Sequence, residues 1–140
     1  MLGLQEAIQL AKDQQSSLRI IHVVDESFAL RFPEVMSGSA GLIDALTKDG
    51  QRILDNTLAL AAQHGVKADG VMCESATSPI AEVILNEAQK WPADIIVMGT
   101  HGRRGFDRVV LGSDAEAMLR TSPVPVLTVR STNKKHGNTQ

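Results

Sequence analysis

Residues 93–105 read Ala-Asp-Ile-Ile-Val-Met-Gly-Thr-His-Gly-Arg-Arg-Gly. The first six form an almost continuous apolar run, which is typical of a parallel strand buried on both faces of a sheet. Gly99 and Gly102 follow at its carboxyl end, and glycine lets main-chain N–H groups approach an anion closely. Because α/β sheets bind ligands outside the carboxyl ends of their strands, this stretch predicts both the fold class and the place of a site.

Helices and strands are predicted to alternate along the rest of the chain. Helical spacing of apolar residues, together with capping patterns, predicts helices over residues 2–15, 42–64, 78–90 and 113–121. Apolar runs predict strands over residues 18–24, 66–74, 93–98 and 124–129. This order predicts an α/β domain, a three-layer α/β/α sandwich with a mainly parallel sheet. Residues 25–41 are expected to form an ordered loop or lid.

Local signals mark several element ends. Ser78 is a good N-cap, and Pro79 after it needs no backbone donor at the first helical position. Gly65 stands where a C-terminal cap would end the long helix, and Gly50 weakens the middle of that helix. Pro125 cannot donate to a ladder, so the last strand is expected at a sheet edge.

The composition excludes several classes of protein. A chain of 140 residues, 43% hydrophobic and 21% charged, fits one domain over residues 1–130 with a polar tail at 131–140. A net charge of −2 and 3% aromatic residues disfavour nucleic-acid binding. No apolar run approaches the roughly 18 residues of a membrane span, and no signal-peptide pattern opens the chain. The single Cys73 excludes a disulfide framework and a Cys-rich zinc site, so we expect a soluble cytoplasmic protein without a metal site.

The loop that follows residue 98 leads to a helix that is a second candidate part of an anion-binding site. A helix that begins at Ser113 would present free N–H groups and the positive end of its dipole. Two interpretations stay open: the loop cradles a polyphosphate, or Ser113 and Glu116 form a capping box that needs no ligand. Asp114 and Glu116 place negative charge where phosphates would lie. The nearby arginines either pair with phosphates or solvate the loop; they are Arg103, Arg104 and Arg108.

The spacing Gly99-x2-Gly102-x9-Gly112-Ser113 resembles the nucleotide motif G-x2-G-x9-G-(S/T) of ATP-binding universal stress proteins. The similarity covers nearly the whole chain, because three further stretches look like strands of that family: residues 21–25, 92–99 and 122–129. The resemblance implies an adenine nucleotide α-hydrolase-like, Rossmann-like fold. It also implies a stress-response module that senses or binds ATP or a related adenine nucleotide, with or without Mg²⁺.

Carried over by position, the resemblance implies that Val23 and Met98 flank the adenine. The three motif glycines would bring main chain to the ribose and phosphates, and Ser113 with the next two amides would bind the phosphate chain. The expected nucleotide-binding residues are therefore Val23, Met98, Gly99, His101, Gly102, Arg103, Gly112, Ser113, Asp114 and Ala115. Family members are commonly homodimers joined through the last strand, which makes Val126, Leu127 and Val129 the expected interface.

No catalytic residue is expected. No Asp, Glu or Ser is spaced to orient His101, and neither a P-loop nor a dinucleotide fingerprint is present. Little or no turnover is expected. Two alternatives remain: a weak ATP hydrolase, and a dimerising interaction protein that no longer binds nucleotide. His22 is expected either in the core or behind the residues that contact a ligand, and Cys73 is expected to act as a small hydrophobe.

The chain departs from the family at its start. Members usually begin with a strand whose Asp contacts the adenine side of the nucleotide, whereas this sequence opens inside the first helix. Unpaired backbone groups beside the missing strand would cost roughly 1–3 kcal/mol each. Three outcomes are open: the sheet closes the gap, a partner chain supplies a strand, or the true start lies upstream. The sequence favours an upstream start, and for the ordered chain we expect gap closure or strand exchange, with lowered nucleotide affinity.

Overall fold

The computed structural model describes residues 2–27, 40–99 and 112–130 of the chain. Helices and strands alternate in these ranges, as the sequence predicts. The helices are α1 (Leu2–Gln14), α4 (Ala40–Gln63), α5 (Ile80–Lys90) and α6 (Ser113–Thr121). The strands are β1 (Leu18–Asp25), β2 (Ala68–Ser75), β3 (Ile96–Gly99) and β4 (Val126–Val129). The expected lid over residues 25–41 and the tail at 131–140 lie largely or wholly outside the described residues.

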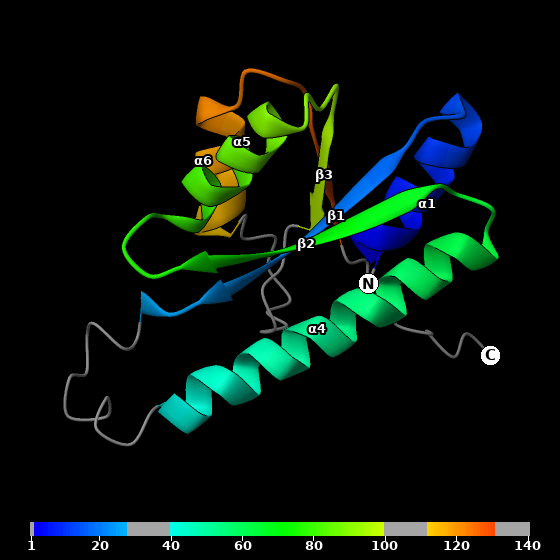
Figure 1. The fold of residues 1–140 in the computed structure, drawn as a ribbon. Helices are drawn as coiled ribbons and strands as arrows, with labels where there is room; N and C mark the ends of the chain where they lie inside the picture. Colours follow the sequence, from blue (N-terminus) through cyan, green and yellow to red (C-terminus); the bar gives the residue numbers. More distant parts are fainter. Residues whose placement is uncertain (1, 28–39, 100–111, 131–140) are drawn as a thin grey trace, which may run out of the picture.

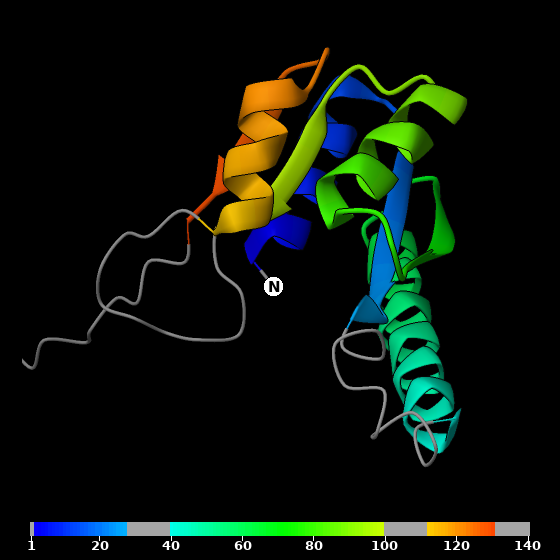
Figure 2. The same ribbon diagram turned by 90° about the vertical axis from the view of Figure 1, so that its left-hand side faces the viewer.

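The elements form three layers, with helices on both sides of the strands (Figures 1 and 2). On one side, α4 packs on β1 and β2, while α1 packs on β3 and β4. On the other side, α5 packs against α6 and against the β1–β2 pair. The hydrophobic core joins α1 to α4 through four buried side chains, Ile8, Ala11, Ala61 and Val66. The three-layer α/β/α prediction is therefore confirmed.

The strands form two parallel pairs instead of one sheet. β1 pairs with β2 in register from Leu18↔Ala68 to Asp25↔Ser75, and β3 pairs with β4 from Ile96↔Val126. Among the described residues β1 and β3 are not hydrogen-bonded to each other. Of the two expected outcomes, closure of the gap is therefore wrong, and strand exchange between copies stays a prediction.

Two predicted helix ends can be compared with the structure. Gly65 has a φ of +73°, the left-handed conformation of a C-terminal cap, so its predicted role is confirmed. The N-cap of α5 is Pro79, with φ −58° and ψ 146°, so the prediction of Ser78 is wrong. The reason is that Pro79 is still extended, and the carbonyl of Ser78 accepts a hydrogen bond from the Ser75 hydroxyl.

Close contacts through two glycines place α4 on the β1–β2 pair. A Cβ added to Gly50, in the middle of α4, would lie 2.6 Å from Cδ2 of His22 in β1. A Cβ added to Gly70 in β2 would lie 2.8 Å from Cδ1 of Leu54 in α4. His22 is half-buried under the helix. The glycine that weakens α4 locally is therefore required by packing.

Candidate functional site

The predicted site residues that the structure describes gather at one edge of the molecule. The carboxyl ends of β1 and β3 and the first turn of α6 all lie at the same side in both ribbon views (Figures 1 and 2). Val23 is half-buried near the end of β1, and Met98 and Gly99 end β3. This is the edge at which α/β proteins bind their ligands.

The first turn of α6 presents main-chain donors. Its N-cap is Gly112, with φ −59° and ψ 152°, and no side chain caps the helix. Ser113 is already the first helical residue, and Glu116 accepts a hydrogen bond from Arg120 Nη2 at 2.9 Å instead of reaching back. The capping-box interpretation is therefore wrong. Among the described residues, the N–H groups of Ser113 and the next two residues have no acceptor.

Charge and burial make this turn asymmetric. Ala115 is 2% exposed and fixes the turn against the core, while Ser113 and Asp114 are exposed. The free amides give the turn a partial positive charge, and Asp114 and Glu116 offset part of it. An anion that binds here would therefore depend on directed hydrogen bonds more than on net charge.

At the other end of the site, Gly99 leaves space for a close approach. A Cβ added to Gly99 would meet no described atom within 4 Å. A Cβ added to Gly3, in the first turn of α1, would lie 3.3 Å from the backbone nitrogen of Gly99. The start of α1 thus packs directly against the Met98–Gly99 peptide. Sequence reasoning missed Gly3; the available signal was a glycine in an otherwise well-formed helix, which costs about 1 kcal/mol without a packing reason.

The centre of the predicted loop lies outside the described residues. His101, Gly102 and Arg103 fall within residues 100–111, as do Arg104 and Arg108, so their expected roles stay predictions.

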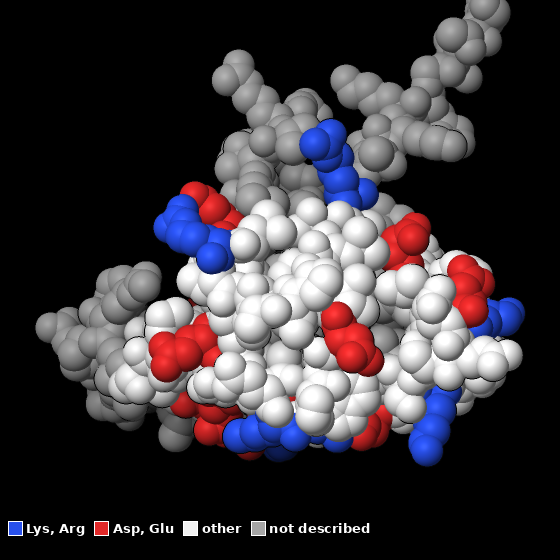
Figure 3. Space-filling view, turned by 90° about the horizontal axis from the view of Figure 1, so that it is seen from above, with Lys and Arg blue, Asp and Glu red and all other residues white. Residues whose placement is uncertain are grey.

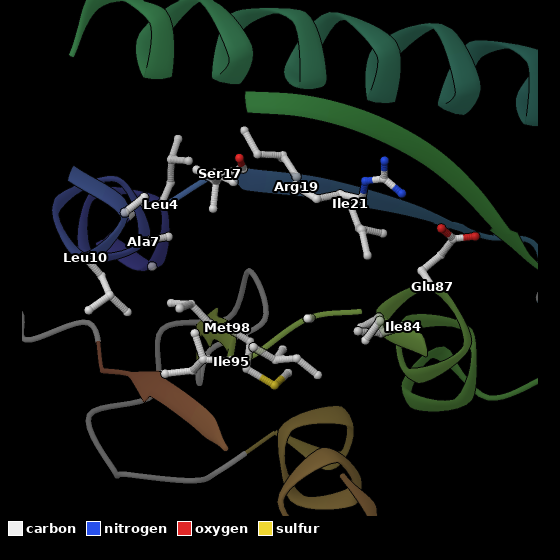
Figure 4. Close-up of a pocket in the computed structure, with 18 of the residues that line it drawn as sticks. Leu4, Ala7, Leu10, Ser17, Arg19, Ile21, Ile84, Glu87, Ile95 and Met98 are labelled. Atoms are coloured by element: carbon white, nitrogen blue, oxygen red, sulfur yellow. The ribbon is translucent and has the colours of Figure 1, made fainter. Parts of the chain in front are cut away.

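A cavity of about 840 Å³ lies next to this edge, between the two strand pairs (Figure 4). Met98 and Gly99 line one end of it, but Val23 and the first turn of α6 do not. The structure therefore joins the end of β3 to the cavity and leaves the donors of α6 beside it.

The ion pair between Arg19 and Asp69 joins β1 to β2 and has a structural role. Arg19 Nε and Nη2 donate to the two carboxylate oxygens of Asp69 at 2.9 and 2.8 Å, and the guanidinium lies 5.1 Å from the centre of the Trp91 ring. The Arg19 hydrogen bond lowers the pKa of Asp69, and the Asp69 hydrogen bond raises the pKa of Arg19. Each ion stabilises the charged form of the other, so neither is suited to proton transfer.

Cys73 and the carboxylates offer no reactive cluster in the part of the chain that is described. Burial, followed by repulsion from Glu87, raises the pKa of the Cys73 thiol, which suits the expected role of a small hydrophobe. No group of three His, Cys, Asp or Glu side chains among those residues could hold a metal ion.

On the face seen in Figure 3, acidic and basic side chains are mixed around an uncharged centre. No helix within the described ranges is long and apolar enough to cross a membrane.

Comparison with known proteins extends these observations. The profile of the Universal stress protein family matches residues 2–130. Universal stress protein MJ0531 of Methanocaldococcus jannaschii is 37% identical over 132 residues, which cover 94% of this chain and 75% of that protein. The structure of UspA from Lactobacillus plantarum is 23% identical, with a TM-score of 0.77 over 91% of this chain and 87% of that one.

A third relative was solved with a ligand. The universal stress protein from Archaeoglobus fulgidus in complex with dAMP is 14% identical, with a TM-score of 0.60 over 91% of this chain and 84% of that chain. At that identity the likeness concerns the fold alone. The solved structures confirm the α/β fold with parallel strands that the sequence predicts.

Proposed function

This chain belongs to the universal stress protein family, and from that premise we propose that it binds an adenine nucleotide, ATP or a close relative. The proposed site is the edge formed by the end of β3 and the first turn of α6. One observation carries the proposal: the first three amides of α6 have no side-chain cap and no acceptor among the described residues. The Archaeoglobus fulgidus protein, which shares this fold, was solved in complex with dAMP, so an adenine nucleotide is the ligand class to test first.

Each of the expected nucleotide-binding residues has a role in this proposal. The amides of Ser113, Asp114 and Ala115 donate to phosphate oxygens, and the exposed Ser113 hydroxyl donates beside them. The open side of Gly99 admits the ribose and phosphates, while Met98 and Val23 contact the adenine from two strands. His101, Gly102, Arg103 and Gly112 complete the loop as the sequence motif implies.

The mechanism that we propose is regulatory. Nucleotide occupancy changes the conformation or the dimerisation of the chain in a stress response, with little or no turnover. Mg²⁺ accompanies the phosphates of ATP when it is present. The outer edge of β4 is the proposed homodimer surface, since Leu127 is 40% exposed there beside Val126 and Val129. The single cysteine suits the reducing cytoplasm as the compartment.

Replacement of Ser113 by proline tests the site with little disturbance of the helix. Ser113 is the first helical residue, where proline is tolerated, and the ψ of 152° at Gly112 suits a residue that precedes proline. Ser113→Pro removes one N–H and the hydroxyl, whereas Ser113→Ala removes the hydroxyl alone. A hydrogen bond to a charged group contributes about 1.5–3 kcal/mol, so we expect Ser113→Pro to weaken ATP binding about tenfold or more, with an unchanged Tm.

Isothermal titration calorimetry with ATP and Mg²⁺, combined with a phosphate-release assay, separates the alternatives. Saturable heat without phosphate release supports the proposed sensor. Steady phosphate release would instead indicate the weak hydrolase. No heat at all would indicate the interaction protein without nucleotide. Equal ATP affinity of Ser113→Pro and the unchanged chain would refute the role of the α6 amides.

A further inference from the structure

The first turn of α1 meets the end of β3 through main chain alone. Gly3 is the second residue of α1, and the helix begins beside the end of β3 (Figure 2). A Cβ added to Gly3 would lie 3.3 Å from the Gly99 nitrogen, 3.6 Å from the Met98 carbonyl carbon and 3.7 Å from the Gly99 Cα. All three atoms belong to the backbone, so no side chain can turn away to make room.

The helix is the rigid partner in this contact. One and two turns after Gly3, Ala7 and Ala11 are buried, and Ile8 belongs to the hydrophobic core that joins α1 to α4. A retreat of α1 would open this core, because interiors are close-packed and a void in them is destabilising.

The end of β3 is the partner that can move. Gly99 is the last residue of β3, and a Cβ added to it would meet no described atom within 4 Å. A Cβ at Gly3 would require its neighbour to give by a few tenths of an ångström. The Met98–Gly99 peptide should make that movement, since it has open space beside it and the helix does not.

We propose that Gly3 is a positioning residue for the nucleotide site. Its missing side chain lets α1 lie directly against the Met98–Gly99 peptide and sets the position of this peptide at the ligand edge. Gly3 itself contacts no part of the nucleotide; it acts through Met98 beside the adenine and Gly99 beside the ribose and phosphates. The inference rests on the proposed function and adds to it the residue behind its binding peptide.

A second explanation is that Gly3 serves only the packing of α1. Alanine is the better helix former, which raises the stability of Gly3→Ala, whereas the tight contact lowers it, so the Tm should change little. A packing role leaves the ATP affinity of the folded variant unchanged. A positioning role predicts a loss of ATP affinity that the Tm does not report.

The size of the loss follows from the size of the shift. A misplacement of 1 Å costs reacting groups about 10²-fold in rate. In proportion, a shift of a few tenths of an ångström at Gly99 should weaken ATP binding about three- to tenfold.

Gly41→Ala is the matched control. Gly41 is the second residue of α4, as Gly3 is of α1, but a Cβ there would meet nothing within 4 Å. Isothermal titration calorimetry with ATP and Mg²⁺ gives the affinity of the unchanged chain and of both variants, and thermal unfolding gives the Tm. We expect Gly3→Ala to bind ATP about three- to tenfold more weakly with a Tm within about 3 °C, and Gly41→Ala to bind as the unchanged chain does.

Nuclear magnetic resonance provides a readout without nucleotide. Gly3→Ala should shift the amide resonance of Gly99, and Gly41→Ala should not. In the unchanged chain we expect a nuclear Overhauser effect between Gly3 Hα and the Gly99 N–H, which tests the contact even if Gly3→Ala does not fold. The absence of this effect would overturn the proposal.

The calorimetric outcomes separate this inference from the proposed function. No saturable heat from the unchanged chain would overturn the proposed function, and the positioning role with it. Saturable heat with equal ATP affinity in the unchanged chain and in Gly3→Ala would overturn the positioning role alone. A large fall in Tm with unchanged affinity of the folded variant would assign Gly3 to packing.

Discussion

Replacement of Gly50 by alanine should destabilise the chain although it improves the helix. Alanine in place of glycine within a helix contributes about 1 kcal/mol of stability. Here the new Cβ would lie 2.6 Å from His22 Cδ2 and 3.0 Å from Met72 Cε, so the imidazole ring and the methyl group must both move. Overpacking of this kind costs about 1–3 kcal/mol. We expect a net loss of about 1 kcal/mol, or roughly 3–4 °C in Tm.

The same helix offers a matched control. A Cβ added to Gly41, in the first turn of α4, would meet nothing within 4 Å, so Gly41→Ala should leave the Tm unchanged or raise it slightly. Thermal and urea unfolding of both variants give the comparison. The double variant Gly50→Ala/His22→Ala should be more stable than the sum of the two single effects, because the clash is gone. A higher Tm for Gly50→Ala alone would refute the reasoning.

Three further predictions concern single contacts. The pKa of Asp69 is lowered by its pairing with Arg19, so this pairing stabilises the fold above about pH 3.9, the ordinary pKa of Asp. The stabilisation is lost as the pH falls through the lowered pKa. Asp69 is 55% exposed, so Asp69→Asn should flatten the acid side of a Tm–pH profile only slightly. Cys73 should react with a disulfide reagent more slowly at pH 8 than a free cysteine, and Glu87→Gln should speed the reaction; an equal rate in both proteins would contradict the assigned repulsion. Leu127→Arg should shift the chain toward monomer in light scattering, and an unchanged mass would exclude β4 as the dimer surface.

The sequence predicts the elements better than it predicts their pairing. The range 113–121 matches α6 to the residue, because polar residues flank a short amphipathic pattern there. The strand predicted over 93–98 begins only at Ile96, since the Ala93 N–H still donates to Ala88 O at the end of α5. An apolar run indicates that a strand is buried, but it does not indicate with which strands it pairs. One sheet was therefore predicted where the structure has two strand pairs.

The site shows the same limit. The sequence around Ser113 predicts that a helix starts there. It does not decide whether Ser113 or Gly112 is the N-cap, because a shift of the helix start by one residue exchanges the two. The contact between Gly3 and Gly99 joins residues that are distant in the chain, and no local pattern encodes it. That β1 and β3 lie apart without pairing also depends on the packing of the layers, which no local pattern encodes.

The first turn of α1 touches two regions at once. Gly3 lines the cavity between the strand pairs, and it also lies against the backbone of Gly99, where the proposed nucleotide site begins. Anything that displaces this helix from one side changes the room left on the other. If a molecule fills this cavity while a nucleotide binds at the edge, any coupling between them is reciprocal, so each changes the affinity of the other by the same factor. A shift of α1 would change the width of the cavity and the position of the Gly99 peptide together.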